Sequence, residues 1–207
     1  MITWEVARHQ VAIAGRVTDS QTNQTVRGAQ VQIAAAPPEF ITWLVNRAMQ
    51  YGSHWRKLIE RPDRTRTATD GHFHFVDLPD GQYTLAASLP DSGSRYGVAQ
   101  VTVAVSRDAQ GRIVRAAADI ALPPTALSGQ ITGQGGAALV MAEVRVKGSG
   151  ERTFSDAQGR YLLAGLEIGS RSVQVAAQGY QPASQTVLLS QAGSVQTLNF
   201  TLVPSTP

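Results

Sequence analysis

The sequence contains two copies of one motif, separated by about 85 residues. The first copy runs from Thr67 to Leu85 and the second from Thr153 to Val175. A shorter pair of phrases also occurs twice: Ile13–Val17 with Gly28–Ile33 in the first half, and Leu127–Ile131 with Ala142–Val146 in the second. A repeat of this length predicts two copies of one domain rather than a solenoid of short units.

Short runs of alternating apolar and polar residues fill both copies. This pattern is typical of half-buried strands, and Asp-Gly pairs such as Asp70-Gly71 and Asp80-Gly81 predict hairpin turns between them. The alternating positions include Val11/Ile13, Val31/Ile33, Phe73/Phe75, Tyr83/Leu85, Val101/Val103/Val105, Ile120/Leu122, Val144/Val146, Val173/Val175, Val187/Leu189 and Leu198/Phe200/Leu202.

The repeated motifs carry a family resemblance. A glycine-bearing first strand, a "G-A-x-V" second strand and hairpins of the types "T-D-x-G-x-F" and "L-x-x-G-x-Y" resemble the carboxypeptidase regulatory-like domain, a relative of the transthyretin and Cna-B sandwiches. The resemblance covers Val11–Leu122 and Ala126–Pro204. In the second copy Gly159 comes two residues later than Gly71 does, and Arg171–Val173 replaces the usual Gly-x-Tyr. The resemblance implies a seven- or eight-stranded scaffold or recognition module without chemistry of its own.

We therefore expect an all-β protein of two tandem prealbumin/Ig-like β-sandwiches. Domain 1 is placed at residues 1–122, a proline-rich connector at 123–125 and domain 2 at 126–207, because the paired prolines favour an extended connection. Between its second and third strands the first copy carries an insertion at about residues 34–66. The second copy needs only Lys147–Arg152 at that place.

The insertion has the pattern of a helix from Glu39 to Arg61. Pro37-Pro38 followed by Glu39 suits a helix start, and Gly52-Ser53 is expected to kink or split the helix. Two apolar stripes follow helical spacing: Phe40, Leu44, Ala48, Tyr51, Trp55, Leu58 and Ile59 form one, and Ile41, Val45 and Met49 the other.

This breadth of apolar surface leaves two interpretations open. The helix either lies back on its own sandwich or keeps part of its surface for a partner. The second is favoured because two of the three tryptophans fall in the insertion, and Trp and Arg are enriched at interface hot spots. The predicted partner-binding residues are Ile41, Trp43, Val45, Arg47, Met49, Trp55 and Arg56.

The charge of the chain is concentrated in the same segment. Residues 34–66 hold six bases and three acids, a net charge of +3 that equals the formal charge of the whole chain. An acidic groove on a protein partner fits this charge best. Nucleic acid is not expected because no binding motif is present, and peripheral membrane contact is a weaker alternative.

No catalytic or cofactor site is predicted. His72 and His74 share a strand face and would need Asp70 or His54 to hold a metal, but the spacing of a third ligand is unconvincing. An internal isopeptide bond, as in Cna-B relatives, would use Lys147 with Asn199 and Glu143 or Glu167. The chain has no cysteine, so neither disulfides nor thiolate metal sites enter the prediction.

Two functions are compatible with these features. The first is a non-enzymatic interaction module in a larger assembly, such as a phage-tail-like or contractile injection particle. Residues 1–10 lack the cationic and apolar regions of a signal peptide, and no apolar run is long enough to span a membrane, so synthesis in the cytoplasm is expected. The alternative is a cell-surface or carbohydrate-binding module, which would need an exposed aromatic platform built from Tyr96, Tyr161 and Tyr180.

Overall fold

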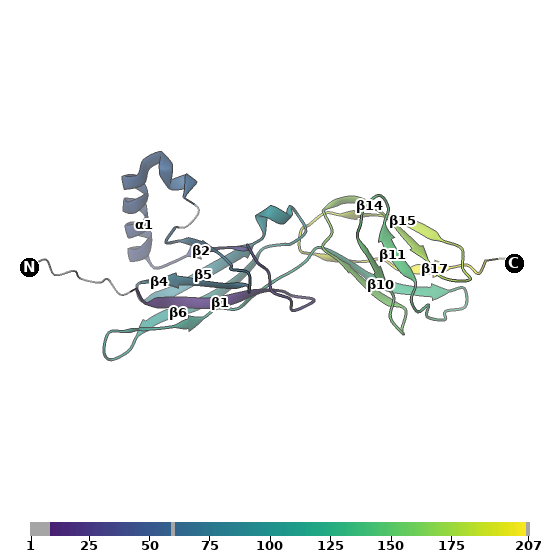
Figure 1. Ribbon diagram of the computed structural model, residues 1–207, viewed down its shortest axis with the longest axis horizontal. Coiled ribbons are helices and arrows are strands. Elements are labelled where there is room, and N and C mark those ends of the chain that lie inside the picture. Colours follow the sequence, from purple (N-terminus) through teal and green to yellow (C-terminus); the bar gives the residue numbers. More distant parts are fainter. Residues whose placement is uncertain (1–8, 59–60, 206–207) are drawn as a thin grey trace, which may run out of the picture. The chain divides into compact units, whose positions relative to one another are not determined.

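The computed structural model describes residues 9–58 and 61–205, which form two units (Figure 1). Contacts group the chain up to Pro90 with Val98–Leu122 in the first unit, and Asp91–Gly97 with the chain from Pro123 onward in the second. The domains predicted from the sequence differ from these units at the loop Asp91–Gly97 and at the connector 123–125, both of which group with the second unit. Within the second unit that loop is held by Thr125, whose N–H donates to the Arg95 carbonyl at 2.8 Å and whose hydroxyl donates to the Ser94 carbonyl at 2.7 Å.

The first unit is a β-sandwich with a helical insertion between its second and third strands, as predicted. Its elements are β1 (Val11–Asp19), β2 (Gln30–Ala35), α1 (Pro38–Tyr51), the 3₁₀ helix η1 (Gly52–Lys57), β3 (Arg64–Arg66), β4 (His72–Val76), β5 (Gly81–Ser88), the 3₁₀ turn η2 (Pro90–Ser92), β6 (Ala99–Arg107), β7 (Ile113–Val114), β8 (Ala116–Ala117) and β9 (Ile120–Leu122). One sheet has the strand order β4-β1-β8, with β9 also paired to β1, and the other has the order β3-β2-β5-β6-β7.

The second unit repeats this plan without the insertion. Its strands are β10 (Ala126–Gly133), β11 (Glu143–Val146), β12 (Arg152–Phe154), β13 (Arg160–Ala164), β14 (Gly169–Ala176), β15 (Ala183–Leu189), β16 (Val195–Thr197) and β17 (Phe200–Leu202). The sheets are β13-β10-β16, with β17 also paired to β10, and β12-β11-β14-β15. The predicted tandem sandwiches are therefore confirmed.

The first strand of each unit carries a glycine where another segment crosses it closely. A Cβ added to Gly15 would lie 2.0 Å from the Ala118 carbonyl oxygen, and one added to Gly129 would lie 2.0 Å from that of Leu198. Directly after the glycine, the strand N–H donates to a side chain of the crossing segment. These bonds run from Arg16 to Asp119 at 2.9 Å and from Gln130 to Asn199 at 2.8 Å.

Each unit also buries one tyrosine in its core. The phenol of Tyr83 donates to the Pro79 carbonyl at 2.9 Å, and that of Tyr161 donates to the Leu198 carbonyl at 2.5 Å. Burial raises the pKa of Tyr83 to about 12, and burial likewise raises the pKa of Tyr161 to about 12.

We expect these two tyrosines to make stability fall in strongly basic solution. In the unfolded chain a tyrosine ionises near pH 10, so between about pH 10 and pH 12 the unfolded state releases its proton while the folded state retains it. The free energy of unfolding should therefore decrease through that range. Urea unfolding at several pH values checks this, with the Tyr83→Phe/Tyr161→Phe variant as reference. An equally steep decrease in the variant would exclude the tyrosines as its cause.

The insertion begins where the sequence predicts and ends its α-helix earlier. Pro38 occupies the first turn of α1 with Glu39 beside it. The α-helix stops at Tyr51 because Gly52 takes φ 55° and ψ −133°, and η1 follows it. The expected kink or split at Gly52-Ser53 is therefore confirmed, and the helical part of the insertion ends at Lys57 rather than at Arg61. Ile59 of the first stripe and Glu60 of the charge count lie outside the described residues.

Candidate interaction surface on the helical insertion

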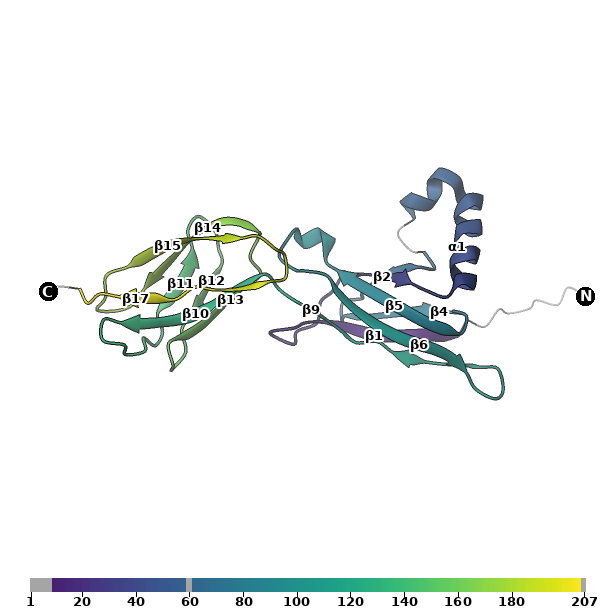
Figure 2. The same cartoon turned by 180° about the vertical axis from the view of Figure 1, so that it is seen from behind.

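The helix α1 is attached to its sandwich through its first turn. Phe40 is 3% exposed and is the buried residue of the helix. Its ring centroid lies 5.8 Å from that of Tyr83 in an edge-on arrangement. Beyond this turn the helix projects away from the strands, which is visible from the front and from behind in Figures 1 and 2. The helix thus contacts its own sandwich through Phe40, and the use of its other apolar residues by a partner stays a prediction.

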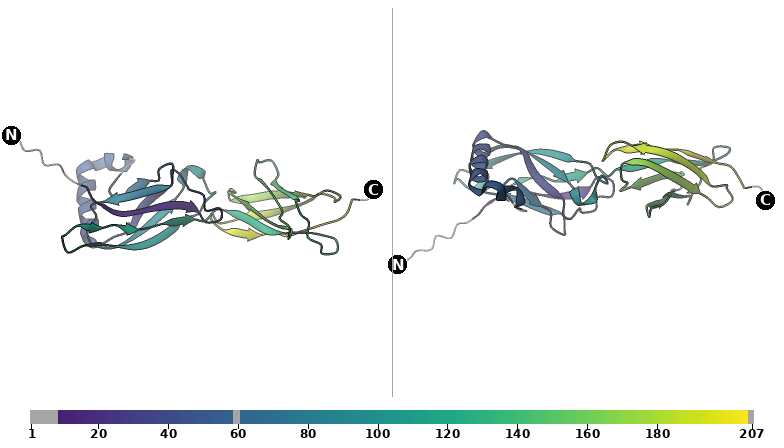
Figure 3. Two further views of the ribbon diagram at one scale, coloured as in Figure 1. Left: turned by 60° about the horizontal axis from the view of Figure 1, so that its bottom comes forward. Right: turned by 90° about the horizontal axis from the view of Figure 1, so that it is seen from above.

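One face of the projecting helix is apolar and open to solvent. Ile41, Val45 and Met49 follow one another at four-residue steps and are 47%, 44% and 73% exposed. We call these three side chains the outer stripe. Figure 3 gives two further views of α1 at the end of the first unit. An apolar stripe of this exposure on an ordered helix is typical of a surface that packs against another molecule.

The remaining predicted partner-binding residues have other surroundings. Arg47 stacks over the rings of Trp43 and Tyr51, with its guanidinium carbon 5.4 Å and 6.0 Å from the two ring centroids. Trp55 is half-buried and carries Arg61 over its ring at 5.1 Å. Arg56 is exposed on η1. The structure thus separates the predicted set into the outer stripe and the aromatic and basic side chains Trp43, Arg47, Trp55 and Arg56, of which Arg47 stacks on Trp43.

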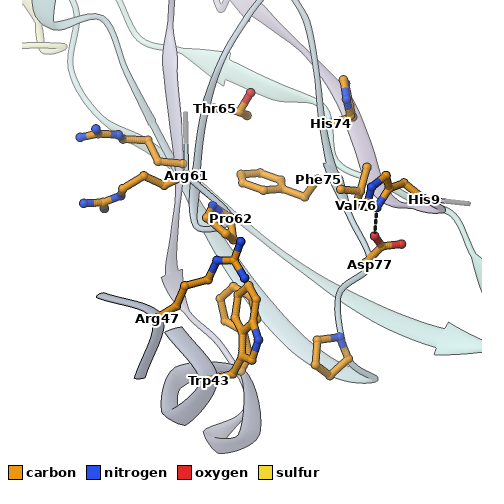
Figure 4. Close-up of a pocket in the computed structure, with 13 residues that line it drawn as sticks. His9, Trp43, Arg47, Arg61, Pro62, Thr65, His74, Phe75, Val76 and Asp77 are labelled. Atoms are coloured by element: carbon orange, nitrogen blue, oxygen red, sulfur yellow. Dashed lines mark hydrogen bonds and ion pairs between the residues drawn. The ribbon is translucent and has the colours of Figure 1, made fainter. Parts of the chain in front are cut away.

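A groove of about 750 Å³ lies between α1 and the strands β3 and β4. In Figure 4 Trp43 and Arg47 line it from the helix, Arg61 and Thr65 line it opposite, and Phe75 points into it. Its lining residues are His9, Phe40, Trp43, Arg47, Arg61, Pro62, Arg64, Thr65, His74, Phe75, Val76, Asp77 and Pro79. We refer to this space as the groove.

Some of the arginines around the groove are paired with a described acid and others are not. Arg61 forms a two-point ion pair with Asp63, at 2.9 Å from Nε and 2.7 Å from Nη2. Arg64 donates to the Leu58 carbonyl, and neither Arg64 nor Arg47 has a carboxylate partner among residues 9–58 and 61–205. The groove therefore carries two guanidinium groups that form no ion pair with a described acid.

Among the described residues, Asp77 is the acid that lines the groove, and it is itself paired. His9 donates from its ring to the Asp77 carboxylate, and the Gln10 N–H donates to the same group at 2.8 Å. Burial alone would raise the pKa of Asp77, but these hydrogen bonds hold that pKa below its usual value. Asp77 therefore remains ionised at neutral pH and is occupied by His9 and Gln10.

The candidate metal and isopeptide sites are not assembled. His72 approaches Asp70 at 3.2 Å, and within the described part of the chain no group of three His, Cys, Asp or Glu could hold a metal ion. In the same part no hydrogen bond joins Lys147 to Asn199, whose side chain instead accepts from Gln130. Of the two acids proposed with them, Glu143 pairs with Arg152 and Glu167 with Arg95. None of these contacts brings the isopeptide set together, and the hypothesis stays a prediction that an intact-mass measurement tests.

Sequence reasoning missed most of the groove. Arg64, Thr65 and Phe75 have ordinary strand environments in the sequence, and His74 entered it only as a possible metal ligand. The one signal for the groove was the excess of arginines at the end of the insertion, close to the motif that forms β4. The fold brings these segments against α1, and residue spacing alone does not show this.

The fold and the groove define a tandem β-sandwich protein with a projecting helix and a basic, aromatic groove. The model of the carboxypeptidase regulatory-like domain matches residues 126–203, which is the part of the chain where the second copy of the motifs predicts this resemblance. The first domain repeats its strand plan. No curated protein matches the sequence.

Several solved structures are similar at low identity. The shaft pilin SpaA from Lactobacillus rhamnosus GG has a TM-score of 0.42 and 11% identity, covering 97% of this chain and 98% of that one. The minor pilin GBS52 from Streptococcus agalactiae has a TM-score of 0.33 and 12% identity, covering 97% of this chain and 98% of that one. The Bacillus anthracis TIE protein has a TM-score of 0.34 and 13% identity, and the match covers 94% of this chain but 34% of that one. Likeness at these values carries no information on binding.

Proposed function

We propose that this protein is a non-enzymatic interaction module that docks on a protein partner through the outer stripe of α1. The observation that carries the proposal is the exposure of Ile41, Val45 and Met49 on a helix whose buried residue is Phe40. A soluble domain gains nothing in its own core from three aligned apolar side chains that face water. They lose that exposure when the helix enters a groove on another protein.

The chemistry of the partner follows from the charge beside the stripe. Arg47 lies on the same helix, and His54, Arg56 and Lys57 lie in the last turn of η1. We therefore propose an apolar groove bordered by acidic residues as the surface that receives the stripe. None of the helices in the described residues is long and apolar enough to cross a membrane.

The setting in an assembly belongs to the same proposal. Tandem sandwiches with a projecting helix suit an accessory building block, and a phage-tail-like or contractile injection particle is the setting we proposed from the family resemblance. The carbohydrate-binding alternative needs an aromatic platform, and no described feature favours it. Tyr161 is buried, while Tyr96 and Tyr180 are partly buried.

The outer stripe is tested by replacing all three of its members. We expect Ile41→Ser/Val45→Ser/Met49→Ser to weaken binding to the native partner at least about tenfold, because hot-spot truncations in an apolar contact cost well over 1 kcal/mol. The partner is isolated from native lysate, purified, and titrated against the variant by isothermal calorimetry. Binding of the wild type should also weaken as salt is raised, because the partner surface is acidic.

The matched control replaces three exposed polar residues of the same helix with the same amino acid. Thr42→Ser/Asn46→Ser/Gln50→Ser should bind the partner as the wild type does. Equal loss of binding in both variants would mean that the helix as a whole is perturbed. Unchanged binding in the stripe variant would refute docking through this face.

A further inference from the structure

We infer that the groove is a second recognition site, which takes an extended acidic segment of a partner protein as an added strand beside β4. The site goes beyond the proposed function, because it lies between α1 and the strands and does not include the outer stripe. Three features support it: an open strand edge, two guanidinium groups without a carboxylate partner among the described residues, and an apolar aromatic lining.

The open edge follows from the pairing of β4. Ala14 of β1 is paired with His74, and the Ala14 carbonyl accepts from the Ala118 N–H at 3.0 Å on the side away from β4. Both backbone polar groups of one strand residue point the same way, so Ala14 and His74 form a non-hydrogen-bonded pair. The N–H and C=O of His74 therefore point outward from the free edge of β4.

His72, two residues earlier in β4, has the same backbone orientation as His74. His72 points its carbonyl outward, where it accepts from the Ala68 N–H at 2.9 Å. For the backbone of His74 no partner is found among residues 9–58 and 61–205. His74 lines the groove, so its free backbone groups are available to a strand that enters there.

The charge of the groove selects an acidic segment. Arg47 and Arg64 reach it from α1 and β3, on different sides, and no described carboxylate pairs with either. Arg64 uses a hydrogen bond to the Leu58 carbonyl, which leaves donors of its guanidinium free. Arg47 is held in place by Trp43 and Tyr51, so it is preorganised for a carboxylate. The remaining acid, Asp77, is already bound by His9.

The lining indicates that the segment also carries large apolar side chains. Phe40, Trp43, Phe75, Pro62 and Pro79 contribute apolar surface, and side chains of an added strand alternate between its two faces. A strand with acids on one face and apolar residues on the other can thus meet the arginines and the aromatic lining together. A volume of about 750 Å³ accommodates several side chains of such a strand.

The test uses a fluorescein-labelled nonapeptide of alternating glutamate and valine with phenylalanine at its centre, titrated against the full chain by fluorescence anisotropy. We expect saturable binding that the Arg47→Gln/Arg64→Gln variant weakens at least about tenfold, because the variant removes both charged donors for the peptide's carboxylates. The peptide with lysine in place of glutamate should not bind. A peptide N-methylated along one edge should bind at least about tenfold more weakly, since strand addition needs its backbone N–H groups.

Two protein variants test whether a loss of peptide binding comes from the groove itself. Arg56→Gln/Lys57→Gln removes the same charge from η1, outside the groove, and should bind the peptide as the wild type does. The outer-stripe variant should also bind the peptide normally, so failure of the peptide site and failure of docking through α1 are distinguishable. Circular dichroism establishes that each variant is folded.

Four results would overturn the inference. They are the absence of saturable peptide binding, equal binding of the lysine peptide, equal weakening by the Arg56→Gln/Lys57→Gln control, and full binding of the N-methylated peptide. Binding of phosphatidylserine vesicles, or self-association of the chain, without peptide binding would assign the groove to a membrane surface or to a second copy instead.

Discussion

Replacing Gly129 with alanine is expected to lower the thermal transition of the second domain strongly and to leave that of the first domain unchanged. The added Cβ would lie 2.0 Å from the Leu198 carbonyl oxygen and 3.0 Å from the ring of Tyr161, and neither the strand nor the buried ring has space to move. Overpacking of this kind costs about 3 kcal/mol or more, which corresponds to a fall of at least roughly 10 °C in the transition of a domain this size. Differential scanning calorimetry measures this.

Gly150 provides the matched control for this substitution. It lies in the same domain, has no neighbouring atom within 4 Å of an added Cβ and does not have a positive φ, so Gly150→Ala should leave the transition unchanged. Gly15→Ala should reproduce the large effect in the first domain, because its Cβ would meet the Ala118 carbonyl. An unaltered calorimetric profile for Gly129→Ala would mean that the crossing segment is not held against β10.

The second large effect is expected from Phe40→Ala. Phe40 is the buried anchor of α1 and contacts the rings of Trp43 and Tyr83. Its truncation should lower the free energy of unfolding of the first domain by about 3 kcal/mol. Because the helix then loses its attachment, peptide binding in the groove should be abolished. Urea unfolding and the anisotropy titration measure the two effects.

Val45→Ala is the reference for Phe40→Ala. It shortens an exposed side chain one turn along the same helix, and we expect a change in stability of less than about 0.5 kcal/mol. Equal stabilities for the two variants would show that α1 is held by contacts other than the first turn. Retention of peptide binding in Phe40→Ala would show that the groove does not depend on the seated helix.

The sandwich plan could be predicted from the sequence because each of its causes is local. Alternating apolar residues mark strands, and the repeated motifs place chemically equivalent groups at equivalent positions. Thr67 accepts from the Ala29 N–H and donates to the Val26 carbonyl, and Ser155 makes the same pair of bonds in the second domain. In both domains a small residue with a hydroxyl group, placed just before the hairpin, thus pairs two backbone groups of the core.

The last strands of the first domain are harder to predict from the sequence. Ile120 and Leu122 alternate like one simple strand, but the chain between Ile113 and Leu122 forms three short strands. The break between β8 and β9 occurs at Ala118–Asp119, where the segment crosses Gly15 and the Asp119 side chain replaces a backbone partner. When a side chain takes the place of a backbone group in the hydrogen bonds between strands, the alternation of apolar and polar residues in the sequence does not reveal it.

The interaction surface could be predicted only in part for the same reason. Helical spacing was enough to place Ile41, Val45 and Met49 on one stripe. It could not show that Phe40 alone would be buried, since that depends on where α1 meets Tyr83. Nor could it show that Arg64 and Phe75 would face Trp43 across a groove, because these residues come from separate elements.

Photo-crosslinking from the outer stripe tests the central claim most directly. The chain has no cysteine, so Val45→Cys offers a single attachment point for a photoreactive group, with Gln50→Cys on another side of α1 as control. Irradiation in the native cell lysate followed by mass spectrometry should join Val45→Cys to one protein, at a peptide bordered by acidic residues, and join Gln50→Cys to it far less. Equal crosslinking from both positions, or crosslinks only to lipid, sugar or the chain itself, would contradict docking through the outer stripe.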